Sequence, residues 1–390
     1  MLKRSKVILA IVLTLAVLAA SMVGMFAVSA DGPATTASIT KVLRMPVNTP
    51  APTASFVFTV TPHALNLNTS AAVVAGMPTV GNVTINTFTT TTNAGVTYLT
   101  GTAANIFGGI TWPNVEGTVR YSYRVVESAT LSSYTGDGDM TFSVAVYYAT
   151  VVVVDGVVTE VIVYRHTGDT GESDTGKVGP IDGNVTMTFT NNYILDRGTY
   201  PPDPIDNAVM SVSKEISGDA ASATTAFPFT MTITVADFVA EAGDYFVARI
   251  VQNGAIVGNP VTFTLSGTPL TATATFNLTA GQRLSFGSLP VGTGYSVTEL
   301  ATPLYRASVN VQDGGAAFTY TNTYFNANLY VTNRFTGANT NLAAFNNYRS
   351  QEPILGLGIG DLPFVGLILI ALGGFIAFVV VKSRKRSQSC

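Results

Sequence analysis

The sequence predicts an all-β protein built from two β-sandwich units in tandem. Two observations lead to this fold class. Between residues 39 and 344, Thr, Val, Phe and Tyr recur in alternation and are interrupted by Gly, Pro, Asn and Asp, as is typical of short strands joined by turns. Four landmarks also occur twice in the same order, which indicates a duplicated architecture with diverged loops. We find no convincing amphipathic helix in this region.

The landmarks are an opening strand with a Lys, a Phe-rich strand, a strand that ends in Glu, and a strand with an inward Asn. They read SITK at 38–41, TASFVF at 53–58, YRVVE at 123–127 and TFTNNY at 188–193, then SVSK at 211–214, TAFPF at 225–229, YSVTE at 295–299 and FTYTNTY at 318–324. We therefore expect a first unit at 31–194, a Pro-rich linker at 195–208, a second unit at 209–324 and a spacer or stalk at 325–361.

Both chain ends predict export and anchoring. Residues 1–30 have a basic start, an apolar stretch and a small-residue site, which is the pattern of a secretory signal peptide. Residues 362–381 are uncharged and mostly apolar, long enough for a transmembrane helix, and the basic tail at 382–390 predicts a cytoplasmic end. We therefore expect the membrane as the partner of the C-terminal span, with residues 31–361 facing outside.

The composition of the exported part excludes several kinds of site and partner. Its 13 basic residues against 23 acidic ones give a net charge near −10, which argues against nucleic acid as a partner. The single cysteine, Cys390, lies in the inner tail, so no disulfide, thiolate metal site or cysteine nucleophile is available outside. We expect no cofactor and no metal site.

Lysine is so scarce in the exported part that its positions carry information. Only Lys41, Lys177 and Lys214 occur there, and two of the three open the repeated units. Alternate side chains of a strand share a face, and this parity turns Lys41 and Lys214 toward the apolar interior. The same parity turns Glu127 and Asn191 inward in the first unit.

In the second unit the inward pair is Glu299 and Asn322 by the same reasoning. Burial pushes a lysine toward its neutral, nucleophilic amine and a glutamate toward its neutral acid. Such a Glu can polarise the Asn side-chain carbonyl and relay protons while the amine attacks and ammonia leaves. The product is a Lys–Asn isopeptide bond, and a buried salt bridge or hydrogen-bonded network of the same residues is the alternative.

These residues carry a resemblance to known families. Residues 39–193 resemble the pilin isopeptide-linkage domain of Gram-positive FctA-type pilus shaft proteins. The second unit, with FNLTAGQRLSFGSLPVGTGYSVTE at 276–299 and FTYTNT, resembles CnaB-like domains of Gram-positive surface proteins. The resemblance implies Ig-like β-sandwiches, each with an internal Lys–Asn bond catalysed by Glu or Asp. The matching positions are Lys41, Glu127 and Asn191 in the first unit and Lys214, Glu299 and Asn322 in the second.

The resemblance also implies partners. Pilus shaft proteins polymerise through a lysine near the position of Lys177, which makes it a candidate acceptor for a sortase, with an ordinary exposed lysine as the alternative. The usual Leu-Pro-x-Thr-Gly sortase motif is not matched, because the candidates EPILG at 352–356 and LPFVG at 362–366 both lack the Thr. Membrane anchoring is then the alternative to attachment to the cell wall.

The remaining candidates are weaker. Two acidic sets, Asp137 with Asp139 and Asp169 with Glu172 and Asp174, are calcium candidates, although solvated turns explain them as well. Taken together, the sequence predicts a structural cell-surface protein, a pilus subunit or stalk in contact with other pilus subunits. The alternative is an adhesin that binds a host or matrix ligand through residues 65–93 or 131–184. A turnover enzyme is the third and least supported class.

Overall fold

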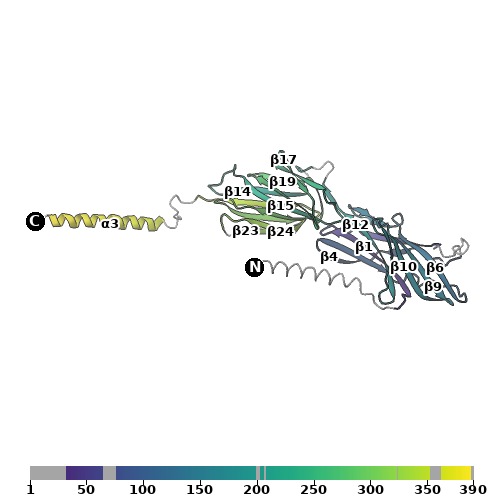
Figure 1. The fold of residues 1–390 in the computed structure, drawn as a ribbon. Coiled ribbons are helices and arrows are strands. Elements are labelled where there is room, and N and C mark those ends of the chain that lie inside the picture. Colours follow the sequence, from purple (N-terminus) through teal and green to yellow (C-terminus); the bar gives the residue numbers. More distant parts are fainter. Residues whose placement is uncertain are drawn as a thin grey trace, which may run out of the picture.

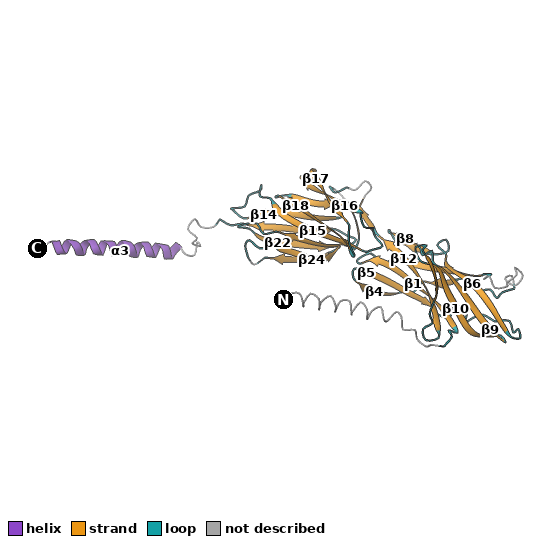
Figure 2. Ribbon diagram, viewed as in Figure 1, coloured by secondary structure: helices purple, strands orange, loops and turns teal. Residues whose placement is uncertain are grey.

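The computed structural model describes residues 32–64, 76–198, 203–205, 208–322, 324–351 and 362–387. Apart from one helix towards the C-terminus, the regular structure of these residues is β-strand, as the sequence predicts. The strands form two multi-sheet β units that lie end to end (Figures 1 and 2). The predicted signal peptide at 1–30 lies outside the described residues.

The first unit pairs a five-stranded sheet with a seven-stranded sheet. The five-stranded sheet has the order β4 (Thr89–Asn93), β5 (Val96–Ala103), β1 (Thr36–Pro46), β12 (Asn184–Ile194) and β8 (Asp139–Thr141). The other sheet has the order β11 (Ser173–Lys177), β10 (Val157–Thr167), β9 (Val146–Val154), β6 (Thr118–Glu127), β2 (Thr53–Pro62) and β3 (Val83–Ile85), with β7 (Ser133–Thr135) also on β2.

The second unit has the same plan with different extensions. Its seven-stranded sheet has the order β17 (Ala255–Thr264), β16 (Tyr245–Gln252), β19 (Gln282–Phe286), β14 (Met210–Ser217), β25 (Asn341–Tyr348), β22 (Arg306–Asp313) and β23 (Ala316–Thr321). Its four-stranded sheet has the order β18 (Leu270–Leu278), β15 (Phe227–Val235), β21 (Gly294–Glu299) and β24 (Leu329–Phe335).

The first and last strands of each unit pair with each other in parallel. In the first unit β1 pairs with β12, and in the second β14 pairs with β25. The order β5-β1-β12-β8 corresponds to β19-β14-β25-β22, and β2-β6-β9 corresponds to β15-β21-β24. By this correspondence the β10–β11 hairpin is an addition of the first unit.

The predicted end of the second unit at residue 324 is wrong. Both β24 and β25 lie in the stretch expected to be a spacer, and both complete the sheets of this unit. The error has a physical reason: β25 pairs with β14, more than a hundred residues earlier, and such a long-range partner leaves no local mark in the sequence.

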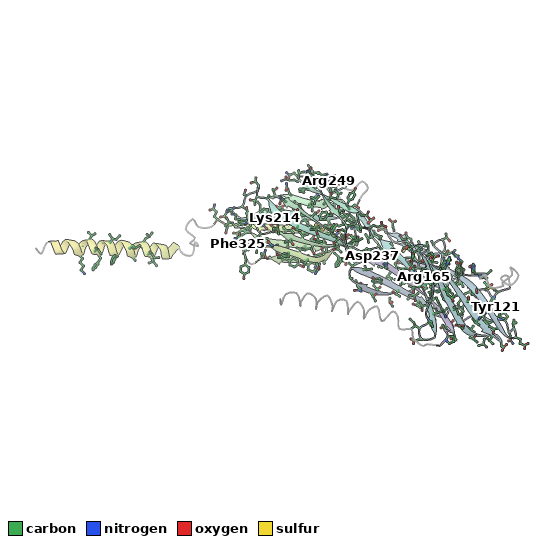
Figure 3. All side chains as sticks on the ribbon, in the orientation of Figure 1. Tyr121, Arg165, Lys214, Asp237, Arg249 and Phe325 are labelled. Atoms are coloured by element: carbon green, nitrogen blue, oxygen red, sulfur yellow. The ribbon has the colours of Figure 1, made fainter. Side chains whose placement is uncertain are left out.

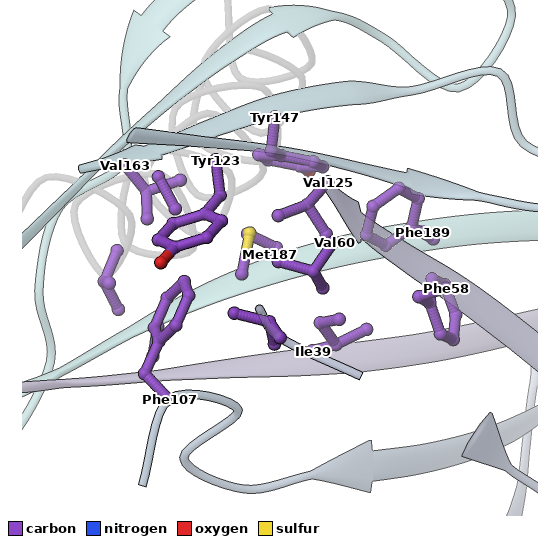
Figure 4. Packing of buried hydrophobic residues seen from close by; sticks show 14 of the residues in the cluster. Ile39, Phe58, Val60, Phe107, Tyr123, Val125, Tyr147, Val163, Met187 and Phe189 are labelled. Carbon is purple, nitrogen blue, oxygen red and sulfur yellow. The ribbon is translucent and has the colours of Figure 1, made fainter. Parts of the chain in front are cut away.

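Apolar residues fill the space between the two sheets of each unit. In the first unit Phe58 and Phe189 come from opposite sheets, and their ring centroids lie 4.9 Å apart (Figure 4). The second unit repeats this contact with Phe229 and Phe345, whose centroids are 5.1 Å apart. Strand alternation produces both cores, because every second side chain points inward.

The junction between the units is held by backbone and side-chain contacts. The short strand β13 (Asp196–Gly198) lies in the predicted linker, where no strand was expected, and pairs with β20 (Ser288–Pro290). The guanidinium of Arg44 lies 3.8 Å from the carboxylate of Asp237 and 4.6 Å from the centre of the Phe238 ring. Figure 3 shows Asp237 between the units. The Arg44 contacts join the end of β1 to the second unit, and the β13–β20 pairing joins the linker to it.

The C-terminal helix α3 (Leu362–Ser387) covers the predicted span at 362–381. Among the residues that the structure describes, no helix meets the length and apolarity needed to cross a membrane. The transmembrane span therefore stays a prediction from the sequence.

Candidate functional site

In the first unit, Lys41, Glu127 and Asn191 meet between the two sheets. Lys41 donates from Nζ to Glu127 Oε2 over 2.7 Å, and Asn191 donates from Nδ2 to Glu127 Oε1 over 2.8 Å. Lys41 and Asn191 are both 0% exposed. One carboxylate therefore bridges an amine and an amide in a site closed to water.

The strand register explains how the three side chains meet. Lys41 on β1 lies opposite Phe189 on β12, so Asn191 is two residues further along and on the same face. Glu127 comes from the other sheet, where it lies opposite Phe58. The Lys and the Asn thus project from neighbouring parallel strands, and the Glu reaches them across the sandwich.

Burial shifts the protonation of the pair toward the reactive forms. Loss of solvation lowers the pKa of Lys41 from 10.5 to about 8, against the opposing effect of the Glu127 carboxylate. Loss of solvation also raises the pKa of Glu127, while Lys41 and Asn191 act in the other direction. The phenyl ring of Phe56 lies 4.7 Å from Lys41 Nζ and adds to the apolar surroundings.

The second unit holds an equivalent group, but its amide is Asn347. Lys214 Nζ lies 3.0 Å from Glu299 Oε1, and Asn347 Nδ2 donates to the same oxygen over 2.6 Å. Lys214 lies opposite Phe345, so Asn347 is again two residues further along the parallel last strand. Burial likewise lowers the pKa of Lys214 to about 8 and raises the pKa of Glu299.

The assignment of Asn322 to this site is wrong. Asn322 follows the edge strand β23 and donates its side-chain amide to the backbone carbonyls of Ala327 and Asn328. Phe318 on β23 is 38% exposed, so the alternation in this strand does not mark a core face. A sequence signal for the right residue exists, because AAFNNY at 343–348 repeats the Phe-x-Asn of TFTNNY at 188–193.

The other predicted residues lie outside the two buried groups. Lys177 is exposed at the end of β11. The acidic set Asp169, Glu172 and Asp174 surrounds Arg165, whose guanidinium nitrogens lie 2.9 Å from Asp174 and 3.1 Å from Asp169. The three carboxylates therefore pair with a guanidinium cation. In the described parts of the chain, no group of three or more His, Cys, Asp or Glu is placed to hold a metal ion.

The long stretches suggested as ligand loops contain strands. Residues 76–93, the described part of the first stretch, include β3 and β4, and residues 131–184 include β7 to β11. These segments therefore complete or extend the sheets.

The chain was compared with known families, curated proteins and solved structures. Residues 208–335 match DUF7601, a domain of unknown function. This match stops before β25, the strand that carries Asn347. The search of curated proteins found no match.

Among solved structures, the major pilin from Streptococcus pyogenes is similar, at 19% identity and a TM-score of 0.34 over 82% of this chain and 100% of that one. A second Streptococcus pyogenes major pilin, T3.2, shows 15% identity and a TM-score of 0.31 over 82% of this chain and 100% of that one. A pilus-presented adhesin, Cpa, matches 49% of this chain and 36% of its own, at 14% identity and a TM-score of 0.23.

Proposed function

We propose that this chain is a structural cell-surface protein, a pilus subunit or stalk, whose two units each close themselves with a Lys–Asn isopeptide bond. The bonds join Lys41 to Asn191 and Lys214 to Asn347. The observation that carries the proposal is the repetition of a buried Lys–Glu–Asn group at the same register between the first and last strands of both units.

The chemistry follows from the contacts. Glu127 and Glu299 each touch both the amine and the amide nitrogen, so each can accept a proton from the lysine and deliver one to the departing ammonia. Burial between two sheets holds nucleophile and electrophile together, which replaces a bimolecular encounter by an intramolecular step. Each group reacts once, so the chain acts on itself and needs no turnover activity.

The position of the bonds suits a protein under tension. A force applied at the two ends of a unit acts on its first and last strands, and a covalent bond between these strands carries that force without strand separation. No cysteine is needed, and the amide bond is stable to reduction. With the predicted signal peptide at 1–30 and the predicted span at 362–381, we propose a location on the surface of a Gram-positive-type cell, together with other subunits of the same assembly.

Intact-mass measurement of the purified full chain tests the bonds. Each bond lowers the mass by one ammonia, about 17 Da, and two bonds lower it by about 34 Da. An unshifted mass would contradict the proposal.

Assembly needs a separate test on the native cell surface. If the protein is a polymerised subunit linked through Lys177, surface extracts contain high-molecular-weight ladders that resist denaturant, and Lys177→Ala removes them. Unchanged ladders in this variant would reject Lys177 as the acceptor but leave the internal bonds untouched.

A further inference from the structure

The two buried groups differ at the oxygen of the asparagine side chain. Asn191 Oδ1 accepts a hydrogen bond from the backbone N–H of Ser143 over 2.7 Å. In the second unit, Asn347 Oδ1 and Glu299 Oε2 have no hydrogen-bond partner among the described residues. This carbonyl oxygen gains negative charge when an amine attacks the adjacent carbon, so the difference lies where the reaction needs a donor.

Ser143 is held in place by a second layer of contacts. Its hydroxyl donates to Asp169 Oδ1 over 2.5 Å, and the same oxygen accepts the backbone N–H of Thr190 over 2.9 Å. Thr190 is the residue before Asn191, so Asp169 fastens the Ser143 segment to the strand that carries the amide. Arg165 binds the other oxygen of Asp169 over 3.1 Å and lies within the first unit (Figure 3).

This second layer belongs to the first unit alone. Asp169 lies in the turn between β10 and β11, the hairpin that has no counterpart in the strand order of the second unit. The stretch that corresponds to Ser143 there lies on β22, because β22 takes the place of β8 beside the last strand. This strand stays paired with β25 as far as Asp313, and its Ser308 donates the hydroxyl to the backbone carbonyl of Asn346.

The Ser143 contact also fixes which way the amide faces. A backbone N–H can only donate, so the atom it meets must be Oδ1, and Nδ2 is left pointing at Glu127. From the sequence, we expected the Glu to polarise the carbonyl. In the first unit the Glu instead contacts the leaving nitrogen, and the backbone N–H contacts the carbonyl oxygen.

We propose that the Ser143 N–H acts as an oxyanion donor for the Lys41–Asn191 bond, that Asp169 positions it, and that the Lys214–Asn347 bond forms without such a donor. This inference rests on the proposed isopeptide chemistry. With this donor, the Lys41–Asn191 bond should form faster than the Lys214–Asn347 bond.

The step balances with the residues present. Glu127 takes a proton from the Lys41 ammonium, and the free amine attacks Asn191 Cγ while the carbonyl electron pair moves to Oδ1, which faces the Ser143 N–H. Glu127 then delivers its proton to Nδ2 and accepts one from the attacking nitrogen. The Cγ–Nδ2 bond breaks, ammonia leaves, the amide forms, and Glu127 ends protonated.

The test follows both bonds in one molecule. The full chain is synthesised in a cell-free system with detergent, and the reaction is stopped in samples taken at intervals. Each sample is digested, and mass spectrometry measures the two cross-linked peptide pairs. Ser143→Pro removes the N–H, and we expect the first bond to form about 100-fold more slowly while the second keeps its rate. Ser38→Ala is the matched control, because Ser38 is as buried as Ser143 and hydrogen-bonds Thr186 on the same strand pair.

Asp169 provides the second arm, which decides the question if Ser143→Pro does not fold. Asp169→Ala should slow the first bond, and Asp169→Asn should restore much of the rate, because the Asn oxygen can still accept from Ser143 and Thr190. The inference would be overturned if the first bond formed in Ser143→Pro or in Asp169→Ala at the same rate as in the wild type. Parallel slowing of both bonds would also overturn it, whereas loss of both bonds in the wild type would refute the proposed function itself.

Discussion

Asn347 donates its side-chain Nδ2 to Glu299 Oε1 over 2.6 Å, although the two residues are 48 positions apart in the sequence. The contact exists because β25 pairs in parallel with β14 and so brings Asn347 beside Lys214, opposite the strand that ends in Glu299. This contact identifies Asn347 as the amide of the buried group in the second unit.

The first prediction separates Asn347 from Asn322. Asn347→Ala should remove one ammonia loss and raise the mass relative to the fully bonded wild type by about 17 Da beyond the substitution itself, because the lysine then has no partner. Asn322→Ala should keep both losses, since the Asn322 side chain donates to the backbone carbonyls of Ala327 and Asn328 and not to Glu299. Intact-mass spectrometry reads out both variants, and the opposite pattern would restore Asn322 to the site.

The second prediction concerns the two glutamates. Glu127→Gln keeps the shape of the side chain but cannot relay protons, so it should abolish the first bond and leave the second. Glu299→Gln should do the reverse. Peptide mapping of each unit checks this, and normal bond formation in both variants would mean that the carboxylates play no part in the chemistry.

The third prediction concerns stability. A bond from Lys41 to Asn191 closes a loop of 150 residues. By analogy with disulfides, it should stabilise the unit by about 4–5 kcal/mol. Asn191→Ala should therefore lower the unfolding transition of the first unit. Calorimetry of the full chain measures it, with the transition of the second unit as an internal control that should stay in place.

The fourth prediction concerns pH. In Asn191→Ala, Lys41 stays an amine whose folded-state pKa burial lowers from 10.5 to about 8. Between these values the unfolded chain binds more protons than the folded one, so stability rises with pH across this window by at most about 1.4 kcal/mol per pH unit.

In a wild type that carries the proposed bond, the lysine nitrogen is an amide, so Lys41 titrates in the variant alone. The difference in unfolding free energy between the wild type and Asn191→Ala should therefore narrow from pH 8 to pH 10. Denaturant titrations of the first unit at several pH values measure this, and parallel curves would argue that Lys41 is not bonded in the wild type.

The fifth prediction concerns the junction. Gly292 has a φ of +78°, and a Cβ there would come within 2.3 Å of the carbonyl oxygen of Val47 in the first unit. Gly292→Ala should loosen the contact between the units without changing the ammonia loss. Gly281→Ala is the control, because its φ is +72° but a Cβ would meet nothing within 4 Å. Small-angle scattering should show a broader range of unit orientations for Gly292→Ala alone.

Much of the first site was predictable from the sequence. Strand parity turned Lys41, Glu127 and Asn191 inward, and the structure brings all three together. The role of the Ser143 N–H was not predictable, because a backbone donor leaves no residue type to read. Its position depends on Asp169, which comes from a hairpin beyond the common plan of the two units.

By itself the sequence determined the β class, the duplication, and the two lysines and two glutamates of the buried groups, because alternation, repetition and residue scarcity do not depend on which strands pair. Only the tertiary structure decided which asparagine completes the second group. Parity names the face of a strand but not its neighbour, and the partner of Lys214 lies 133 residues later on β25. Asn322, the asparagine that strand parity selected, follows an edge strand instead, so the partner of Lys214 depends on strand order, which forms only on folding.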